Sequence, residues 1–205
     1  MDCFWHNAAR CMSRFSEVIR GCEWVVLHIL SRERASPHNF AAMAEVFQIP
    51  HSASREQIYS ALTPQLRALL SGETDPMANA ANFAALVNTA FGFHWVGFYW
   101  VRNEELVLGP FQGPVACTRI AKGRGVCGAS WVQGATIIVP DVDVFPGHIA
   151  CSALSKSEIV VPVRGRNGEV LGVLDIDSVS PGDFTEVDKH YLEMWVSLWV
   201  EASHV

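Results

Sequence analysis

The stretch EIVVPVRGRNGEVLGVLDID, residues 158–177, decides the fold more clearly than any other part of the chain. It contains two β-rich runs, Glu158–Arg164 and Glu169–Asp177, on either side of Asn167-Gly168. An Asn-Gly pair between such runs is a strong signal for a tight hairpin with a type I′ turn. Apolar residues then recur at helical spacing over 183–202. The chain is therefore predicted to end in a β-hairpin followed by an amphipathic helix.

Upstream of this hairpin, the pattern predicts two helices and a second hairpin. Helical spacing covers 54–72 and 75–91, and Pro64 predicts that the first helix restarts or bends there. Alternation predicts a strand over 94–101, whose partner at 106–108 is ended by Gly109-Pro110. The remaining expected elements are a short helix over 125–132, a strand over 136–139 and a loop over 141–156. Hairpin-joined strands with helices at both ends predict an α+β fold, with a mostly antiparallel sheet flanked by helices.

Length and composition describe a globular chain of 205 residues, of which 50% are hydrophobic and 18% charged. This length fits one domain with an appendage or two small domains. The net charge of −6 argues against a nucleic-acid backbone as the partner. No apolar run approaches the length that a membrane helix needs. Composition therefore favours an enzyme or a module that binds a small ligand.

The first 42 residues differ from the rest of the sequence. They carry five Arg, no Lys and four acidic residues, whereas residues 43–205 carry 10 basic and 17 acidic groups. We interpret residues 1–42 as an N-terminal extension of unknown role and residues 43–205, which begin at Met43, as the folded domain. An organelle transit peptide and a misassigned start codon both stay open as explanations of the extension, and its acids count against the first.

Three cysteines, Cys117, Cys127 and Cys151, lie beside glycines and prolines on predicted loops or at the end of a predicted helix. Without a secretory signal, a structural disulfide framework is a poor first explanation. Their spacings do not match the paired knuckles of structural zinc sites either. Cys127 comes near the start of the short predicted helix, where backbone N–H groups favour a thiolate. The three cysteines therefore predict thiol chemistry, and no metal site is expected.

Carboxylates and aromatic rings form the other unusual patterns. Asp175 and Asp177 share one face of an otherwise apolar strand, and Glu158 begins the partner strand. Three clustered carboxylates would hold a proton near neutral pH, which suits a general acid or a site for an ammonium group. Trp95 and Tyr99 also share one face of a strand. A solvated strand face and core packing are the open alternatives, but an aromatic wall opposite carboxylates fits a small zwitterion with an apolar tail.

These stretches resemble the free methionine-(R)-sulfoxide reductases, a family with the GAF-domain fold, from about Ala44 to Glu201. The matching motifs are LGPFQG at 108–113, AC at 116–117, GRGVCG at 123–128, DV at 141–142, FPGHIAC at 145–151, SKSEIV at 155–160 and GVLDIDS at 172–178. GAF domains that act as sensors lack this set of cysteine motifs. Residues 1–42 have no counterpart in the family, and Ser152 stands where many relatives have an acidic residue.

The resemblance implies a GAF-like catalytic domain over 43–205 and a role for each residue singled out above. By this resemblance, Cys151 is the nucleophile, Cys117 is the resolving cysteine and Cys127 is an auxiliary thiol. The substrate-binding residues that match are Trp95 and Tyr99, around the methylthio end, and the carboxylates Glu158, Asp175 and Asp177.

The implied reaction reduces free L-methionine (R)-S-oxide to L-methionine through a cysteine sulfenic acid and an intramolecular disulfide. No bound cofactor is expected, and thioredoxin is the expected external reductant. The expected assembly is a homodimer in the cytoplasm, with no nucleic-acid or membrane partner and with organelle targeting by residues 1–42 left open. The alternative function is a GAF sensor module that binds a ligand without catalysis.

Overall fold

A single antiparallel sheet of six strands, in the order β3-β2-β1-β6-β5-β4, forms the centre of the computed structural model. The structure describes residues 47–50, 52–149 and 152–205. The strands are β1 (Trp95–Arg102), β2 (Glu105–Gln112), β3 (Arg119–Ala121), β4 (Ile137–Val139), β5 (Ser157–Arg164) and β6 (Val170–Ser178). The hairpin that residues 158–177 predict is the pair of strands β5 and β6, and β6 pairs with β1 at the centre of the sheet.

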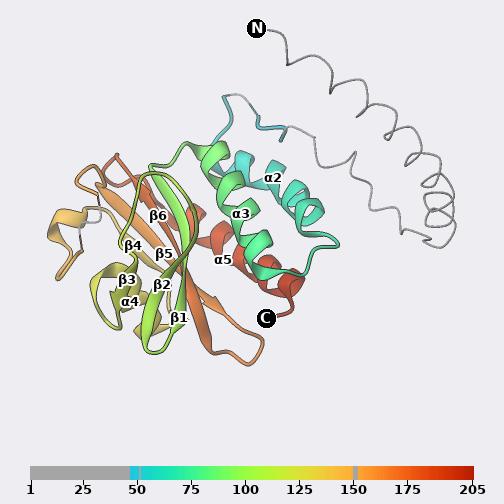
Figure 1. Cartoon of the computed structure of the whole chain (residues 1–205). Coiled ribbons are helices and arrows are strands. Elements are labelled where there is room, and N and C mark those ends of the chain that lie inside the picture. Colours follow the sequence, from blue (N-terminus) through green and yellow to red (C-terminus); the bar gives the residue numbers. More distant parts are fainter. Residues whose placement is uncertain (1–46, 51, 150–151) are drawn as a thin grey trace, which may run out of the picture. The chain divides into compact units, whose positions relative to one another are not determined.

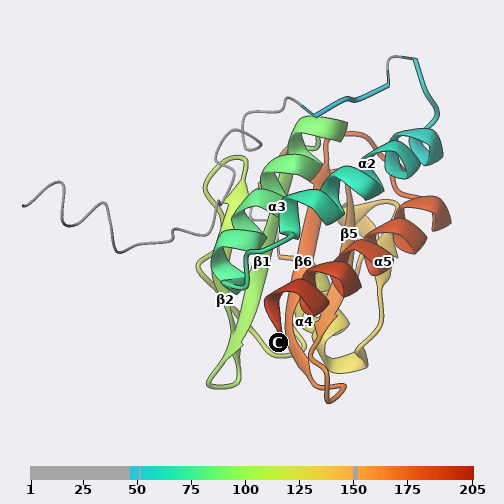
Figure 2. The same cartoon turned by 90° about the vertical axis from the view of Figure 1, so that its right-hand side faces the viewer.

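Helices cover the two faces of the sheet unequally. Figure 1 shows α2 (Arg55–Leu70), α3 (Pro76–Phe91) and α5 (Glu186–Ser203) on one face, and α4 (Gly125–Gln133) on the other. Figure 2 gives the view onto the three-helix layer, with the sheet behind it. A short 3₁₀ helix, η2 (Val142–Val144), lies in the segment between β4 and β5. The predicted antiparallel α+β architecture is therefore confirmed.

The alternation of side chains along β1 divides the interior into two hydrophobic clusters. Val96, Phe98 and Trp100 belong to the cluster under α2, α3 and α5. Trp95 and Tyr99 belong to the second cluster, which includes Trp131 of α4. The prediction that Trp95 and Tyr99 share one face is confirmed, because successive side chains of a strand point to opposite faces.

The helices begin and end within three residues of the predicted positions, but the proline in α2 does not interrupt its helix as predicted. A capping box at Ser54 starts α2, and Asp75 caps α3 ahead of Pro76. The predicted restart at Pro64 is wrong, because α2 runs without interruption from Arg55 to Leu70. Proline cannot donate a backbone bond to Ser60, but both residues are exposed, so water can take the place of the missing donor.

Strand β2 is longer than predicted, because Gly109-Pro110 does not end it. The register of β1 with β2 shifts between Gly97 and Tyr99, so a β-bulge accommodates Gly109 and Pro110 within β2. On its other side, β2 pairs with β3 only over Glu105–Val107, which leaves Pro110 at an edge where a strand tolerates proline. Strand β3 was not predicted, since a three-residue run has too little pattern to be recognised.

The turn between β5 and β6 differs in type from the one predicted. Asn167-Gly168 belongs to a three-residue loop, in which the Gly168 N–H donates to the Gly165 carbonyl at 2.9 Å. Gly168 has a φ of 87°, but Asn167 is not among the described residues with positive φ, so the predicted type I′ turn is wrong. Positive φ at both central positions, as type I′ requires, occurs instead at Asn103 and Glu104 between β1 and β2.

The interpretation of residues 1–42 as an extension falls outside the described residues, as does the boundary at Met43. Of the helices in the described part of the chain, none is long and apolar enough to cross a membrane.

Candidate active site

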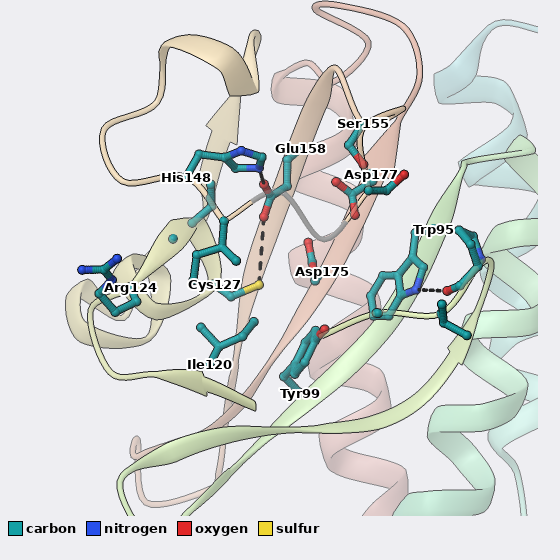
Figure 3. A pocket seen from close by; sticks show the side chains of 17 residues that line it. Trp95, Tyr99, Ile120, Arg124, Cys127, His148, Ser155, Glu158, Asp175 and Asp177 are labelled. Carbon is teal, nitrogen blue, oxygen red and sulfur yellow. Dashed lines mark hydrogen bonds and ion pairs between the residues drawn. The ribbon is translucent and has the colours of Figure 1, made fainter. Parts of the chain in front are cut away.

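The register of three neighbouring strands brings the predicted carboxylates together. Asp177 of β6 lies opposite Trp95 of β1 on one side and opposite Glu158 of β5 on the other. Asp175 lies two residues earlier on the same face, while Leu174 and Ile176, the residues on either side of Asp175, face the helix layer. Both Asp residues and Glu158 therefore line one pocket, on the face of the sheet that α4 covers (Figure 3).

Burial keeps this cluster from being fully ionised. Glu158 and Asp175 are only 5% and 7% exposed. Burial, and then the charge of Asp177, raise the pKa of Glu158 to about 8. Burial and the charges of Glu158 and Asp177 raise the pKa of Asp175 well above its usual range. The pKa of Asp177 is raised by burial, against the opposing effects of a hydrogen bond from Ser155 and of two histidines. The cluster therefore holds at least one proton at neutral pH.

Cys127 lies in the first turn of α4 and its thiol points toward the carboxylates. Its Sγ is 4.0 Å from Oε1 of Glu158, and the residue is 4% exposed. Burial and the charges of Asp175 and Glu158 raise the pKa of Cys127 well above its usual range. The expected thiolate at this helix end is therefore wrong, because desolvation and neighbouring carboxylates outweigh the attraction of the helix N–H groups.

Two stacked rings form a wall of the pocket next to the carboxylates. The centroids of Trp95 and Tyr99 are 5.8 Å apart, and Phe111 stacks on Trp95 at 5.4 Å. Gly97 makes room for this wall, because a Cβ there would lie 2.3 Å from the Trp95 ring. The Trp95 indole donates to the Pro114 carbonyl at 3.1 Å, and the Tyr99 hydroxyl donates to the Cys117 carbonyl at 2.9 Å. Their polar ends thus fix both rings against the segment that carries Cys117.

The predicted redox cysteines are only partly within the described residues. Cys117 is disulfide-bonded, and its backbone carbonyl holds Tyr99. Cys151 lies outside the described residues, so its role and its pairing with Cys117 stay predictions. Ile149 and Ser152, the described residues nearest to it in sequence, both line the pocket. Nε2 of His94 lies 3.0 Å from Oγ of Ser152.

Sequence reasoning did not place several polar residues that line the same pocket. Nε2 of His148 lies 3.5 Å from Oε2 of Glu158, and Ser155 reaches Asp177 from the segment before β5. Arg124 precedes α4 and also lines the pocket (Figure 3). His148 lies within the motif FPGHIAC and Arg124 within GRGVCG. Their closeness in sequence to the cysteines of these motifs was the signal that could have placed them in the site. Donor atoms close enough to hold a metal ion occur, among the described residues, on Cys127, Glu158 and Asp175.

Comparison with known proteins gives the family of this arrangement. Residues 81–198 match the family described as GAF domain. GAF domain-containing protein A of Dictyostelium discoideum is 55% identical over 157 residues, which cover 76% of this chain and 98% of that protein. The free methionine-R-sulfoxide reductase of Escherichia coli is 44% identical over 145 residues, which cover 70% of this chain and 87% of that protein.

A solved structure resembles the described fold closely. The free methionine-R-sulfoxide reductase from Neisseria meningitidis, in complex with its substrate, superposes with a TM-score of 0.74 and 48% sequence identity. The match covers 78% of this chain and 96% of that one. The likeness therefore covers most of this chain and nearly all of that one.

Proposed function

The chain belongs to the GAF-domain family of free methionine-(R)-sulfoxide reductases, and from this premise we propose that it reduces free L-methionine (R)-S-oxide to L-methionine by thiol chemistry. The observation that carries the proposal is the pocket itself. A buried carboxylate cluster that retains a proton lies beside a stacked aromatic wall, and Cys127 and the segments around Cys117 complete the lining.

The geometry supports the binding of a small zwitterion. The carboxylates Glu158, Asp175 and Asp177 offer acceptors for the substrate's ammonium group, since a charge pair of this kind offsets part of the cost of burial. Trp95 and Tyr99 offer an apolar surface for the methyl group on sulfur. With ammonium and methyl groups fixed at two places, only one sulfoxide epimer would present its oxygen to a proton donor. A buried ammonium site would also exclude a methionine within a peptide, whose nitrogen is acylated.

The chemical step needs a nucleophile and a proton. In the proposed reaction, the Cys151 thiolate attacks the sulfoxide sulfur while a carboxylic acid of the cluster, with Glu158 as the leading candidate, protonates the sulfoxide oxygen. The substrate S–O bond then breaks, the hydroxyl group passes to the Cys151 sulfur, and methionine leaves. The substrate gains two electrons, Cys151 is oxidised to a sulfenic acid, and the carboxylate regains its proton from solvent.

The second half of the cycle restores the thiols. The Cys117 thiol attacks the sulfenic sulfur, water leaves, and a disulfide forms between the two cysteines. An external dithiol, for which we propose thioredoxin, then reduces the disulfide by exchange. Cys127 is an auxiliary thiol in this scheme, because the raised pKa of its buried group makes it a poor nucleophile. We also propose a homodimer in the cytoplasm as the working form.

A turnover assay on three substrates tests the proposal. Free L-methionine (R)-S-oxide, its S epimer and a peptide-bound sulfoxide are each supplied with thioredoxin, thioredoxin reductase and NADPH. We expect consumption of NADPH and formation of methionine with the free R epimer only. Stoichiometric binding of the R epimer without any methionine formed would instead assign the chain to the ligand-binding GAF modules.

A further inference from the structure

One group of side chains in the pocket combines a thiol with two carboxylates. The donor atoms of Cys127, Glu158 and Asp175 all lie within 4.8 Å of one another, and the three residues are buried. They come from α4, β5 and β6, so no spacing in the sequence reveals the group. Figure 3 shows their polar ends turned toward one another. Cys127 is a free thiol, and the proposed reaction gives it no direct part.

A second observation shows that this group has capacity for a ligand. Asp175 is 7% exposed, and its Oδ1 has no hydrogen-bond partner among the residues that the structure describes. A buried carboxylate oxygen without a protein donor favours a cationic partner, because burial of an unpaired acceptor is costly. The substrate's ammonium group can satisfy this oxygen during turnover. Between turnovers, any other cation of suitable size and softness can do so as well.

We propose that Cys127, Glu158 and Asp175 form a binding site for a borderline-soft divalent cation of the Zn²⁺ type. One sulfur and two oxygen donors select such an ion, since Mg²⁺ and Ca²⁺ prefer oxygen ligands alone. Bond lengths near 2.3 Å to sulfur and about 2.0–2.2 Å to oxygen require the donors to draw together by about 1 Å. Binding releases the thiol proton, and any carboxylic proton, to solvent.

His148 extends the site beyond these three ligands. Its Nε2 lies 3.5 Å from Oε2 of Glu158, so the imidazole can orient this carboxylate or complete the coordination itself. As a residue that orients Glu158, His148 leaves the fourth position of a tetrahedral site to water, and as a ligand it fills that position itself.

The consequence of the site is reversible inhibition, which rests on the proposed function. An ion held by Glu158 and Asp175 occupies the acceptors that the substrate's ammonium group needs, and removes the proton that the cluster would donate. Zn²⁺ should therefore compete with methionine sulfoxide, and a chelator should restore turnover.

Direct binding of Co²⁺ tests the site without any turnover. The full-length protein, fully reduced by a phosphine, is titrated with Co²⁺, whose bonds to thiolates give a charge-transfer absorption band. We expect one such band to be lost in Cys127→Ser, and Co²⁺ affinity to fall at least tenfold in Glu158→Gln and Asp175→Asn. Asp177→Asn is the matched control, because this carboxylate lies on the same strand but outside the group. Because Asp177→Asn removes only a nearby charge and no ligand, its loss of affinity should be at least threefold smaller than that of Asp175→Asn.

The outcomes separate this proposal from the proposed function. An unchanged charge-transfer band in Cys127→Ser, or parent affinity in both carboxylate variants, would overturn the metal site whatever the assay of turnover shows. Equal weakening by Asp177→Asn and Asp175→Asn would do the same, because it would indicate a general effect of charge. If Cys127→Ser loses its far-ultraviolet circular dichroism, the variant is unfolded and its spectrum does not count. The Co²⁺ affinities of Glu158→Gln and Asp175→Asn then decide whether the metal site exists. Metal binding as expected in a chain that fails to turn over would support the site and contradict the reductase.

Discussion

At the scale of single residues, the carboxylates that line the pocket give the sharpest prediction about activity. Glu158→Gln, Asp175→Asn and Asp177→Asn keep the size of each side chain but remove its charge and its acidic proton. At least one should lower kcat/KM by about 10²-fold or more, the usual scale of general acid catalysis. A rise in KM with unchanged kcat would identify the group that holds the ammonium. Parent kinetics in all three variants would refute the acid-cluster mechanism.

The raised pKa of Glu158 also predicts how stability depends on pH. Burial raises this pKa to about 8 in the folded protein, above the value of 4.5 expected for the unfolded chain. The native state therefore binds more protons than the unfolded state between these values, so the free energy of unfolding falls as pH rises through the interval. Urea unfolding should show a smaller fall between pH 5 and about pH 8 for Glu158→Gln than for the parent. Equal slopes would mean that Glu158 ionises normally in the folded protein.

Gly97 is predicted to be necessary for the aromatic wall. A methyl group at Gly97 would collide with the Trp95 ring and with Cβ of Phe111. Gly97→Ala should raise KM about tenfold and cost about 1–3 kcal/mol of stability, as overpacking does. Gly109→Ala is the control, since its methyl group would meet Trp100, which belongs to the cluster under the helices. It should cost a similar stability without changing KM. An unchanged KM for Gly97→Ala would show that the wall does not contact substrate.

At the scale of elements, α2 and α5 are joined by a buried carboxylate. Asp188 is completely buried, accepts hydrogen bonds from Tyr59 at 3.0 Å and Arg55 at 3.1 Å, and caps its own helix through Thr185. Asp188→Ala should cost about 2–4 kcal/mol, less than a fully isolated buried pair, because Arg55 keeps its ion pair with Asp183. Thermal or urea unfolding measures this loss.

The control for this prediction is an exposed ion pair on the same helix. Lys189 lies 3.6 Å from Glu186, and such pairs contribute little. Lys189→Ala should change stability by no more than about 0.5 kcal/mol. A loss in Asp188→Ala as small as that of the control would mean that the buried contacts only offset the cost of desolvating them.

The predictability of these elements follows from the length of their patterns. Long periodic runs such as α3, α5 and the hairpin of β5 with β6 could be recognised, because many residues repeat the same preference. The continuation of β2 through Pro110 could not, since it depends on a free edge that only the assembled sheet creates. The three-residue loop at Gly168 could not be predicted for a similar reason, because the register of the paired strands selects the type of turn.

The site was predictable where one strand carried the pattern and unpredictable where contacts cross between elements. The shared face of Asp175 and Asp177 follows from alternation along β6, and their approach to Glu158 follows from the hairpin. The ionisation of Cys127 could not be read from its position at a helix start, because the carboxylates that oppose the thiolate lie on other strands. His148 likewise becomes part of the site only through its contact with Glu158 across the pocket.

At the scale of the whole molecule, residues 1–42 are predicted to be dispensable. The regular apolar pattern of the sequence begins only after Met43. Deleting residues 1–42 should therefore change the free energy of urea unfolding by no more than about 0.5 kcal/mol, and kcat/KM by no more than about twofold. Loss of cooperative unfolding or of most activity in the shortened chain would place the extension within the fold.

The most direct test of the reductase is a single turnover without any external reductant. Pre-reduced protein is mixed with free L-methionine (R)-S-oxide, and both released methionine and remaining thiols are counted. The proposal predicts one methionine released and two thiols lost per chain in the parent, and no methionine from Cys151→Ser, since Cys127 is too weakly acidic to replace it. A parent that releases no methionine would contradict the reductase, and a normal burst from Cys151→Ser would move the nucleophile to another cysteine.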